Sequence, residues 1–411
     1  MSIMINMPTA PSAETSAKSE AAAVAGARVL VVDDVKANRD LLVRRLQRLG
    51  VTDILQAEDG RVALDIILSA PLDLVLLDIM MPVMTGFDVL EAMARERRTV
   101  NLPVIVISAM NEMDAIIRAI GLGAEDFLLK PFEPTLLKAR VLTTLEKKRL
   151  RDRIRNELAR KQTELAEARV LQLALAPPSF QDGHCQLEVV LEPAREIGGD
   201  LVDHARLPDG RHLIVLGDVS DKGAGAALVM ARTHALVRSL AARPDAAALL
   251  SNPALAAREL NLILSAGNDS CMFVTMLLAL FDASDGRINY VSCGHVPPFL
   301  RRADGAVERL KVAGGLPLGV SDGADFAVGE AWLAPGDVLL VLSDGVTEAE
   351  TPNGGMFGDE GVLDWISGAS LDLASLVALV RSHEADGPPS DDVSALLLKF
   401  NAYAPAPEGF Q

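Results

Sequence analysis

Residues 74–90 read LVLLDIMMPVMTGFDVL, and this stretch decides the fold of the N-terminal part of the chain. It opens with a continuous apolar run, which is typical of a strand buried on both faces of a parallel sheet. Asp78 and Pro82 interrupt the run far short of the length needed to span a membrane. Asp78 therefore follows a buried strand directly, and binding sites in open parallel sheets form at the carboxyl ends of such strands.

Similar apolar runs surround this stretch and alternate with segments of helical periodicity, such as Leu41, Leu42, Leu46 and Leu49. Five strand–helix units within about 120 residues predict a doubly wound α/β domain with a five-stranded parallel sheet and short loops. We expect its strands at residues 28–32, 53–57, 73–77, 104–107 and 126–129.

Polar side chains follow four of these runs. They are Asp33 and Asp34 after the first, Asp78 after the third, Ser108 after the fourth and Lys130 after the fifth. Three carboxylates at one sheet edge repel one another unless a divalent cation lies among them, and oxygen ligands suit Mg²⁺. Asp78 can then attack a phosphoryl group, and Lys130 can pair with the oxygens of the resulting aspartyl phosphate. The sequence therefore predicts a phosphorylatable acidic pocket.

Residues 26–148 resemble the response-regulator receiver family, whose fold is flavodoxin-like. The resemblance rests on VLVVDDVKANRDLL, LVLLDIMMPVMTGFDVL, VIVISA and DFLLKPF. It implies a sensor histidine kinase as phosphoryl donor and a Mg²⁺ ion beside the phosphoacceptor. The implied roles are metal carboxylates at Asp33 and Asp34, phosphoacceptor and metal ligand at Asp78, a backbone carbonyl ligand at Met80, the switch hydroxyl at Ser108, the switch aromatic at Phe127 and the phosphate-pairing lysine at Lys130.

The charge and composition of the whole chain disfavour some functions and cellular settings. A formal charge of −17 disfavours nucleic acid as a partner, and no helix-turn-helix pattern follows the first domain. Cys185, Cys271 and Cys293 show no CxxC spacing, as expected in a reducing cytoplasm. Residues 1–25 lack the basic start and apolar core of a signal peptide and are predicted to be a disordered tail. We expect a soluble cytoplasmic protein without a membrane partner.

A long helix is expected between the two halves, because no Gly or Pro occurs between Pro134 and Pro177. We assign residues 149–178 to a helical linker whose spacing by four and three suits a coiled coil, so a homodimer is one interpretation. Basic residues cluster at 147–155, which indicates a solvated helix face or, alternatively, a docking surface for an acidic partner. The candidate seam consists of Ile154, Leu158, Lys161, Leu165, Ala168, Gln172 and Leu175.

The pattern changes in residues 179–401. Short apolar runs are separated there by Gly, Pro and Asp, as at Asp209-Gly210 and Asp285-Gly286, which predicts mainly antiparallel strands. Residues 226–240 and 255–264 have helical patterns, so an α+β domain is expected, followed by a tail at 402–411. The expected strands are residues 213–216, 273–281, 288–291, 338–342 and 393–398.

Aspartate recurs at the ends of apolar runs in this half. The four places are Gly199-Asp200, Gly217-Asp218, Asp344-Gly345 and Ser390-Asp391-Asp392. Each one alone is typical of a turn. Together they permit an all-oxygen site that prefers Mg²⁺ or Mn²⁺ to zinc. Two such ions can turn a bridging water into a nucleophile at neutral pH.

From about residue 174 to residue 400 the chain resembles the metal-dependent protein phosphatases of the 2C class, most closely the bacterial SpoIIE-like branch. The resemblance rests on EIGGDLVDHARLPDGRHLIVLGDVSDKGAGAALVMA, FVTMLLALFD, YVSCGHVPPFL, GLPLGV, GDVLLVLSDGVTEA, MFGDEGV and PPSDDVSALLL. It implies layered antiparallel sheets flanked by helices, two Mn²⁺ or Mg²⁺ ions, and a phosphoserine or phosphothreonine protein substrate such as an anti-sigma-factor antagonist. The implied ligands are Asp200, Asp218 as the bridge, the Val219 carbonyl, Asp344 and Asp391, with Asp392 as the alternative to Asp391.

We therefore expect a two-component response regulator whose phosphatase output is gated by phosphorylation of Asp78. A phosphorylation-gated adaptor that uses the phosphatase fold without catalysis remains the alternative, although the intact acids argue against it. A nucleotide cyclase is disfavoured, because Leu201 and Val202 replace the Glu and Phe of its Gly-Gly-Asp-Glu-Phe loop. His295 is interpreted as a structural turn residue, and Asp221 stands where glycine is common in this branch, which leaves the loop geometry open.

Overall fold

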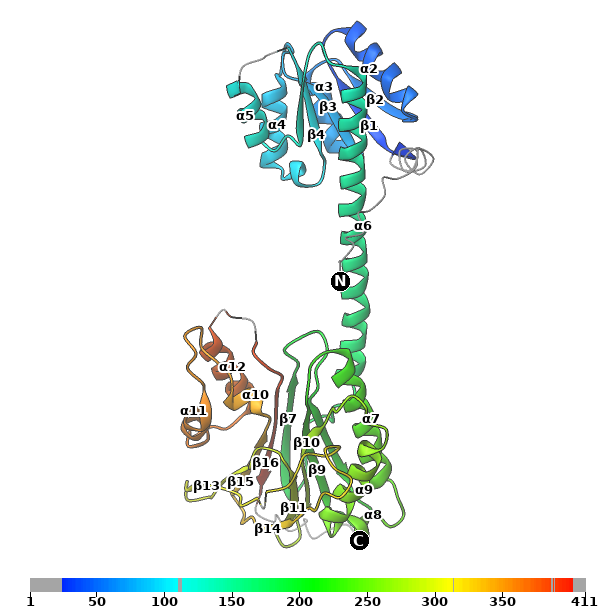
Figure 1. Cartoon of the computed structure of the whole chain (residues 1–411). Coiled ribbons are helices and arrows are strands. Elements are labelled where there is room, and N and C mark those ends of the chain that lie inside the picture. The colour runs from blue at the N-terminus through cyan, green and yellow to red at the C-terminus, as the bar shows by residue number, and fades with distance from the viewer. Residues whose placement is uncertain (1–23, 110–112, 313, 386, 388, 402–411) are drawn as a thin grey trace, which may run out of the picture. The chain divides into compact units, whose positions relative to one another are not determined.

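The computed structural model describes residues 24–401 apart from 110–112, 313, 386 and 388 (Figure 1). The tails predicted at residues 1–25 and 402–411 lie outside this range, except for Val24 and Ala25. The described chain forms two compact units that divide between Arg160 and Lys161. This division falls inside the linker predicted for residues 149–178.

The N-terminal unit is built on a five-stranded parallel sheet in the order β2-β1-β3-β4-β5. The predicted α/β fold is confirmed. Two strands end one residue later than predicted, at Asp78 and Ser108, because these residues still pair with Ile107 and Leu129 of the neighbouring strands. The strands are β1 (Arg28–Val32), β2 (Asp53–Ala57), β3 (Leu74–Asp78), β4 (Val104–Ser108) and β5 (Asp126–Leu129).

Helices cover both faces of this sheet, as a doubly wound fold requires. One face packs against α2 and the first turns of α6 around Leu46, Leu76 and Val141. The other face packs against α3, α4 and α5 around Ile67 and Leu77. The helices are α2 (Lys36–Arg48), α3 (Gly60–Ser69), α4 (Gly86–Arg95), the 3₁₀ helix η1 (Arg98–Val100) and α5 (Met113–Gly121).

The long helix expected after Pro134 is α6 (Pro134–Leu173). Ile154 and Leu158 are 49% and 56% exposed, as unpaired members of a seam would be. The predicted seam is wrong at Gln172, which is only 6% exposed because its side-chain amide pairs with the backbone of Gly198. The last predicted member of the seam also lies beyond the end of the helix.

The C-terminal unit contains two antiparallel sheets packed face to face, in the orders β14-β11-β10-β9-β8 and β13-β12-β15-β16-β7-β6. Leu216, Phe281 and Leu396 belong to the core between the two sheets. Helices α7, α8 and α9 cover the outer face of the first sheet, and α10, α11 and α12 cover that of the second (Figure 1). The predicted layered α+β fold is therefore confirmed.

The predicted run 338–342 is a strand with the same bounds, the run 273–281 is shifted by one residue, and the other predicted runs of this unit are extended at one or both ends. The strands are β6 (Phe180–Gln181), β7 (Cys185–Glu192), β8 (Leu201–Arg206), β9 (His212–Val219), β10 (Val274–Asp282), β11 (Arg287–Cys293), β12 (Phe299–Arg301), β13 (Val307–Arg309), β14 (Val328–Trp332), β15 (Val338–Leu342) and β16 (Val393–Phe400). The helices are α7 (Ala224–Ala241), α8 (Ala246–Leu250), α9 (Pro253–Ser265), α10 (Asp344–Thr347), α11 (Gly358–Ile366) and α12 (Leu373–Glu384). Within the described residues, no helix has both the length and the apolar character needed to cross a lipid bilayer.

Candidate functional site

The buried receiver acids meet at the carboxyl ends of β1 and β3, where Lys130 bridges them. The Lys130 Nζ atom lies 2.6 Å from Asp33 Oδ2 and 2.6 Å from Asp78 Oδ2. Asp33 is fully buried, and its Oδ1 atom accepts hydrogen bonds from the Val35 N–H at 2.9 Å and the Asn38 amide at 3.2 Å. The protein itself thus supplies a positive charge and further hydrogen bonds to these acids.

Asp34 adds an exposed third carboxylate to the receiver site. One oxygen atom from each of Asp33, Asp34 and Asp78 lies within 4.8 Å of the others. Burial raises the pKa of Asp78, although Lys130 opposes this rise. Burial would lower the pKa of Lys130, but its hydrogen bonds to the two acids raise it. Three carboxylates against one ammonium leave two negative charges, so this oxygen donor set fits a Mg²⁺ ion.

The segment after Asp78 depends on the glycine at residue 86. A Cβ atom on Gly86 would lie only 2.3 Å from the Asp78 carbonyl oxygen. With hydrogen there instead, α4 starts directly against the strand end, and Thr85 and Asp88 form a reciprocal capping box. Met80, whose carbonyl is the predicted metal ligand, donates its N–H to Asp78 Oδ1 at 3.3 Å.

The predicted switch residues lie on neighbouring strands. Ser108 is fully buried at the end of β4, and Phe127 is half-buried on β5. Since β4 lies between β3 and β5, the order Asp78, Ser108, Phe127 follows adjacent strands across the sheet. The Lys130 N–H donates to the Ser108 carbonyl at 2.8 Å, which ties Lys130 to the end of β4.

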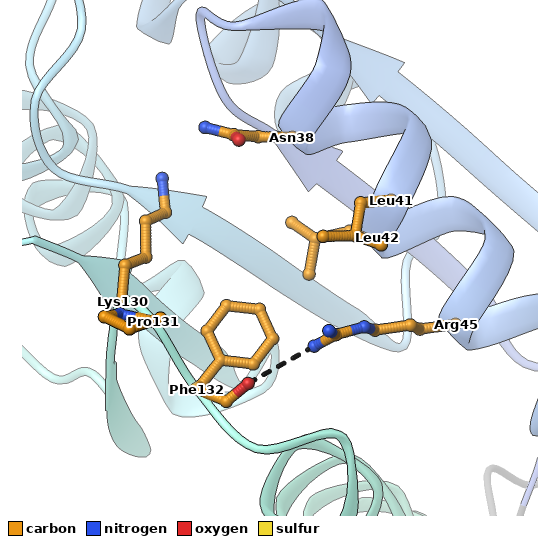
Figure 2. Close-up of a pocket in the computed structure, with 7 residues that line it drawn as sticks. All are labelled: Asn38, Leu41, Leu42, Arg45, Lys130, Pro131 and Phe132. Carbon is orange, nitrogen blue, oxygen red and sulfur yellow. Dashed lines mark hydrogen bonds between the residues drawn. The ribbon is translucent and has the colours of Figure 1, made fainter.

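A cavity of about 350 Å³ lies beside Lys130, between α2 and the loop after β5 (Figure 2). Figure 2 shows the Phe132 ring between the side chains of Lys130 and Arg45, and the Arg45 guanidinium carbon lies 5.0 Å from the ring centroid. Asn38 and Lys130 also bind Asp33, so the cavity and the acidic site share two side chains. The lining residues are Asn38, Leu41, Leu42, Arg45, Lys130, Pro131 and Phe132.

The four predicted phosphatase ligands lie beside strands of both sheets of the C-terminal unit. Asp200 precedes β8, Asp218 lies near the end of β9, Asp344 follows β15 at the start of α10, and Asp391 stands two residues before β16. Strands β8 and β9 belong to one sheet and β16 to the other, and β16 contacts both of them. The site therefore forms where the two sheets approach each other.

These carboxylates raise one another's pKa values. Burial and the charge of Asp218 raise the pKa of Asp200 far above its usual value. Burial and the charge of Asp344 raise the pKa of Asp218 to about 7, and burial and the charge of Asp391 raise the pKa of Asp344. The buried Asp200 Oδ2 atom has no hydrogen-bond partner in the described part of the chain. An orphaned carboxylate oxygen among like charges is a donor set that a hard divalent cation fits.

Asp392 holds a neighbouring loop. Its Oδ1 atom accepts a hydrogen bond from the Ala194 N–H at 2.8 Å, and its Oδ2 atom accepts one from the Gly199 N–H at 2.7 Å. The Asp391 carboxylate is 37% exposed and lies 2.9 Å from the Lys222 Nζ atom. These contacts make Asp391 the better candidate ligand of the two.

Gly199 lies against two further oxygen atoms of the site. A Cβ atom on Gly199 would lie 3.1 Å from the Val219 carbonyl oxygen and 3.5 Å from Asp218 Oδ1. Both oxygens therefore border space that a side chain would fill. Asp221, in the loop after β9, has a φ of 91°, a conformation that glycine, the residue common at this position in the family branch, adopts freely.

The phosphatase acids are more widely spaced than the receiver acids. Among the described residues, no three of the four bring ligand atoms within 4.8 Å of one another. A mixed group of Asp182, Cys185 and His212 does meet this distance. Its contacts are those of a turn, since Asp182 Oδ1 accepts from the Cys185 N–H at 2.8 Å and burial raises the pKa of Cys185 to about 12.

Three other residues complete the description of this region. Lys222, which the sequence analysis did not single out, pairs with Asp391 and donates to the Ser390 carbonyl at 2.9 Å. The sequence feature that could have indicated a role for Lys222 is its position shortly after the Gly217-Asp218 pair. The contact of Gln172 with Gly198 was not predicted, because a polar residue at this helical spacing is typical of a solvent-exposed position. His295 is buried, burial lowers its pKa to about 4, and its ring lies 3.2 Å from the Thr275 hydroxyl, which fits the structural role predicted for it.

Comparisons with known proteins cover both units. Residues 29–142 match the response regulator receiver domain, and residues 208–401 match stage II sporulation protein E. The chain is 34% identical over 120 residues to the chemotaxis protein CheY of Pseudomonas aeruginosa, which covers 29% of the chain and 97% of CheY. It is 30% identical over 226 residues to protein IcfG of Synechocystis sp., which covers 50% of the chain but only 36% of IcfG.

A solved structure supports the fold of the C-terminal unit. The SiaA-PP2C domain of Pseudomonas aeruginosa matches with a TM-score of 0.52 at 19% identity, over 60% of the chain and 99% of that domain. Fold, site and comparisons together define a receiver domain joined to a PP2C-type phosphatase domain. Through residues 29–142 the chain belongs to the response-regulator receiver family, and through residues 208–401 it carries a SpoIIE-type domain.

Proposed function

We propose that the chain is a two-component response regulator whose output is the hydrolysis of phosphoserine or phosphothreonine in a protein. The observation that carries this proposal is the group of buried, mutually repelling carboxylates around Asp200 Oδ2 in a PP2C-type fold. Two Mn²⁺ or Mg²⁺ ions, when bound, supply a nucleophilic water and neutralise the phosphoryl oxygens. The proposed ligands are Asp200, Asp218, the Val219 carbonyl, Asp344 and Asp391.

The proposed gate is phosphorylation of Asp78 by a sensor histidine kinase. Lys130 already lies 2.6 Å from the Asp78 carboxylate, at the place where it can pair with the oxygens of an aspartyl phosphate. Ser108 and Phe127 are the residues proposed to respond, through the hydroxyl and the aromatic ring respectively. Asp33, Asp34 and the Met80 carbonyl would hold Mg²⁺ beside Asp78.

The substrate and setting are proposed from the family. A SpoIIE-type domain behind a receiver suits an anti-sigma-factor antagonist that carries phosphoserine or phosphothreonine. Cys185, Cys271 and Cys293 are all free, which supports a reducing cytoplasm. The exposed Ile154 and Leu158 support dimerisation through α6, and light scattering of wild type and Leu158→Pro tests this point.

The test is hydrolysis of a phosphoserine protein by the full-length chain in the presence of Mn²⁺. We expect turnover by the wild type and none by Asp344→Ala, and phosphorylation at Asp78 should change the rate. If the wild type and Asp344→Ala are equally inactive, the phosphatase proposal fails. Calorimetry then separates the alternative, because an adaptor without catalysis should bind no pair of ions.

A further inference from the structure

The end of α6 is bonded to the loop that leads into Asp200. Gln172 Nε2 donates to the Gly198 carbonyl at 2.8 Å, and Gln172 Oε1 accepts from the Gly198 N–H at 3.1 Å. One turn earlier, Arg169 Nη1 donates to the Arg195 carbonyl at 2.7 Å. These side chains join the helix to the backbone of residues 193–199, and that loop ends beside Asp200.

The Gln172 amide satisfies both backbone groups of Gly198, as a neighbouring strand would. Gln172 and Gly198 are both buried, so loss of the amide would leave a donor and an acceptor unpaired away from water, which is costly. Residue 198 cannot carry a supporting side chain of its own, because a Cβ atom there would lie 2.1 Å from Asp392 Oδ2.

Asp392 holds the other side of the same loop. Its two oxygens accept from the N–H groups of Ala194 and Gly199, at 2.8 Å and 2.7 Å. The loop is thus fixed between the end of α6 and the residue that follows Asp391. Two proposed ligands, Asp200 and Asp391, are adjacent in sequence to this pair of contacts.

We propose that Gln172 is a positioning residue that sets the metal affinity of the phosphatase site by holding Gly198, and through it Asp200. Since α6 begins at Pro134 within the receiver unit, Gln172 also lies where a change carried along α6 would reach the loop before Asp200. This inference rests on the proposed function and assigns its regulation to one side chain.

The test is Mn²⁺ titration calorimetry on the full-length chain. Gln172→Ala is expected to weaken Mn²⁺ binding by roughly tenfold or more, as loss of an outer-shell partner does. Gln172→Met, which fills a similar volume without the hydrogen bonds, should weaken it to the same degree. Leu171→Ala is the matched control, because this neighbour is 72% exposed and should leave the affinity unchanged. Hydrogen exchange of the amides of residues 194–199 in metal-free protein should accelerate in both Gln172 variants only.

The outcomes separate this inference from the proposed function. If the wild type binds Mn²⁺ and both Gln172 variants bind it equally well, the positioning role is overturned and the phosphatase proposal stands. If the wild type binds no Mn²⁺, both are overturned. If these variants do not fold, Gln172→Glu carries the same test, because it keeps an acceptor for the Gly198 N–H but loses the donor to the Gly198 carbonyl, and unchanged affinity in that variant overturns the role.

Discussion

The two acidic sites of this chain balance their negative charge in different ways. In the receiver, the Lys130 Nζ atom lies 2.6 Å from both buried acids. In the phosphatase, the Lys222 ammonium pairs with the half-exposed Asp391, and Asp200 keeps a buried oxygen without a partner among the described residues. The protein itself holds the first site together, whereas the second stays repulsive until cations bind. We therefore expect the first to receive a phosphoryl group and the second to concentrate metal ions.

The largest effect is expected from loss of a phosphatase acid. Asp218→Asn should abolish paired Mn²⁺ binding and lower phosphoserine hydrolysis by more than about a thousandfold, since two ions contribute more than a single oxyanion donor does. Calorimetry and a turnover assay measure both quantities. Because the change relieves repulsion, the metal-free protein should be no less stable than the wild type. Asp322→Ala, an exposed acid of the same unit, is the control, and near-normal turnover by Asp218→Asn would break the comparison.

The matching test in the receiver is removal of the compensating cation. Lys130→Met leaves Asp33 and Asp78 buried side by side, so the receiver unit should lose about 3 kcal/mol of unfolding free energy. Urea unfolding without metal, with separate transitions for the two units, measures the loss, and added Mg²⁺ should offset part of it. Lys36→Met, at an exposed position, should have little effect. A receiver that is equally stable without Lys130 would remove the distinction between the sites.

The sequence predicted the receiver site more completely than the phosphatase site, and topology explains why. In a parallel sheet the strand ends share one edge, so reading Asp33, Asp78 and Lys130 off successive strand ends is enough to bring them together. The proposed phosphatase ligands come from two sheets, and the contact between Asp392 and Ala194 joins residues 198 positions apart. No local pattern predicts such a tether. The burial of Gln172 is likewise decided by tertiary contact, which helical periodicity does not report.

The stabilities of the two units should depend differently on pH near neutrality. All six histidines lie in the phosphatase half, and the receiver has none. Burial lowers the pKa of His204 from 6.5 to about 4. Between these values the unfolded chain binds a proton that the folded chain does not, so stability present above pH 6.5 is lost as the pH falls. The loss for this residue is about 2 kcal/mol at pH 5.

The measurement is the difference in unfolding free energy between wild type and His204→Asn in metal-free protein. This difference should shrink by about 2 kcal/mol between pH 7 and pH 5, since only the wild type carries the His204 contribution. His383→Asn, outside the hydrogen-bonded pair of His204 and His212, is the control for loss of any imidazole. A difference that does not vary with pH would show that His204 is not held neutral by burial.

The smallest effect is expected at Asp221, whose φ of 91° forces a side chain into a region that suits glycine. Asp221→Gly removes this strain of about 2 kcal/mol, but the gain is reduced by the entropy that glycine adds to the unfolded chain. The variant also loses the hydrogen bond from the Lys222 N–H to Asp221 Oδ1, at 2.8 Å. A net gain of about 0.5 kcal/mol in unfolding free energy, measured by denaturant unfolding, is expected, whereas Asp269→Gly, at a position without positive φ, should lose stability. Equal losses in both variants would show that no strain is stored in this loop. A gain in stability without a change in Mn²⁺ affinity would show that the strain does not affect the positions of Asp218 and Val219. The contacts of Asp392 and Gln172 would then be the ones that set metal affinity.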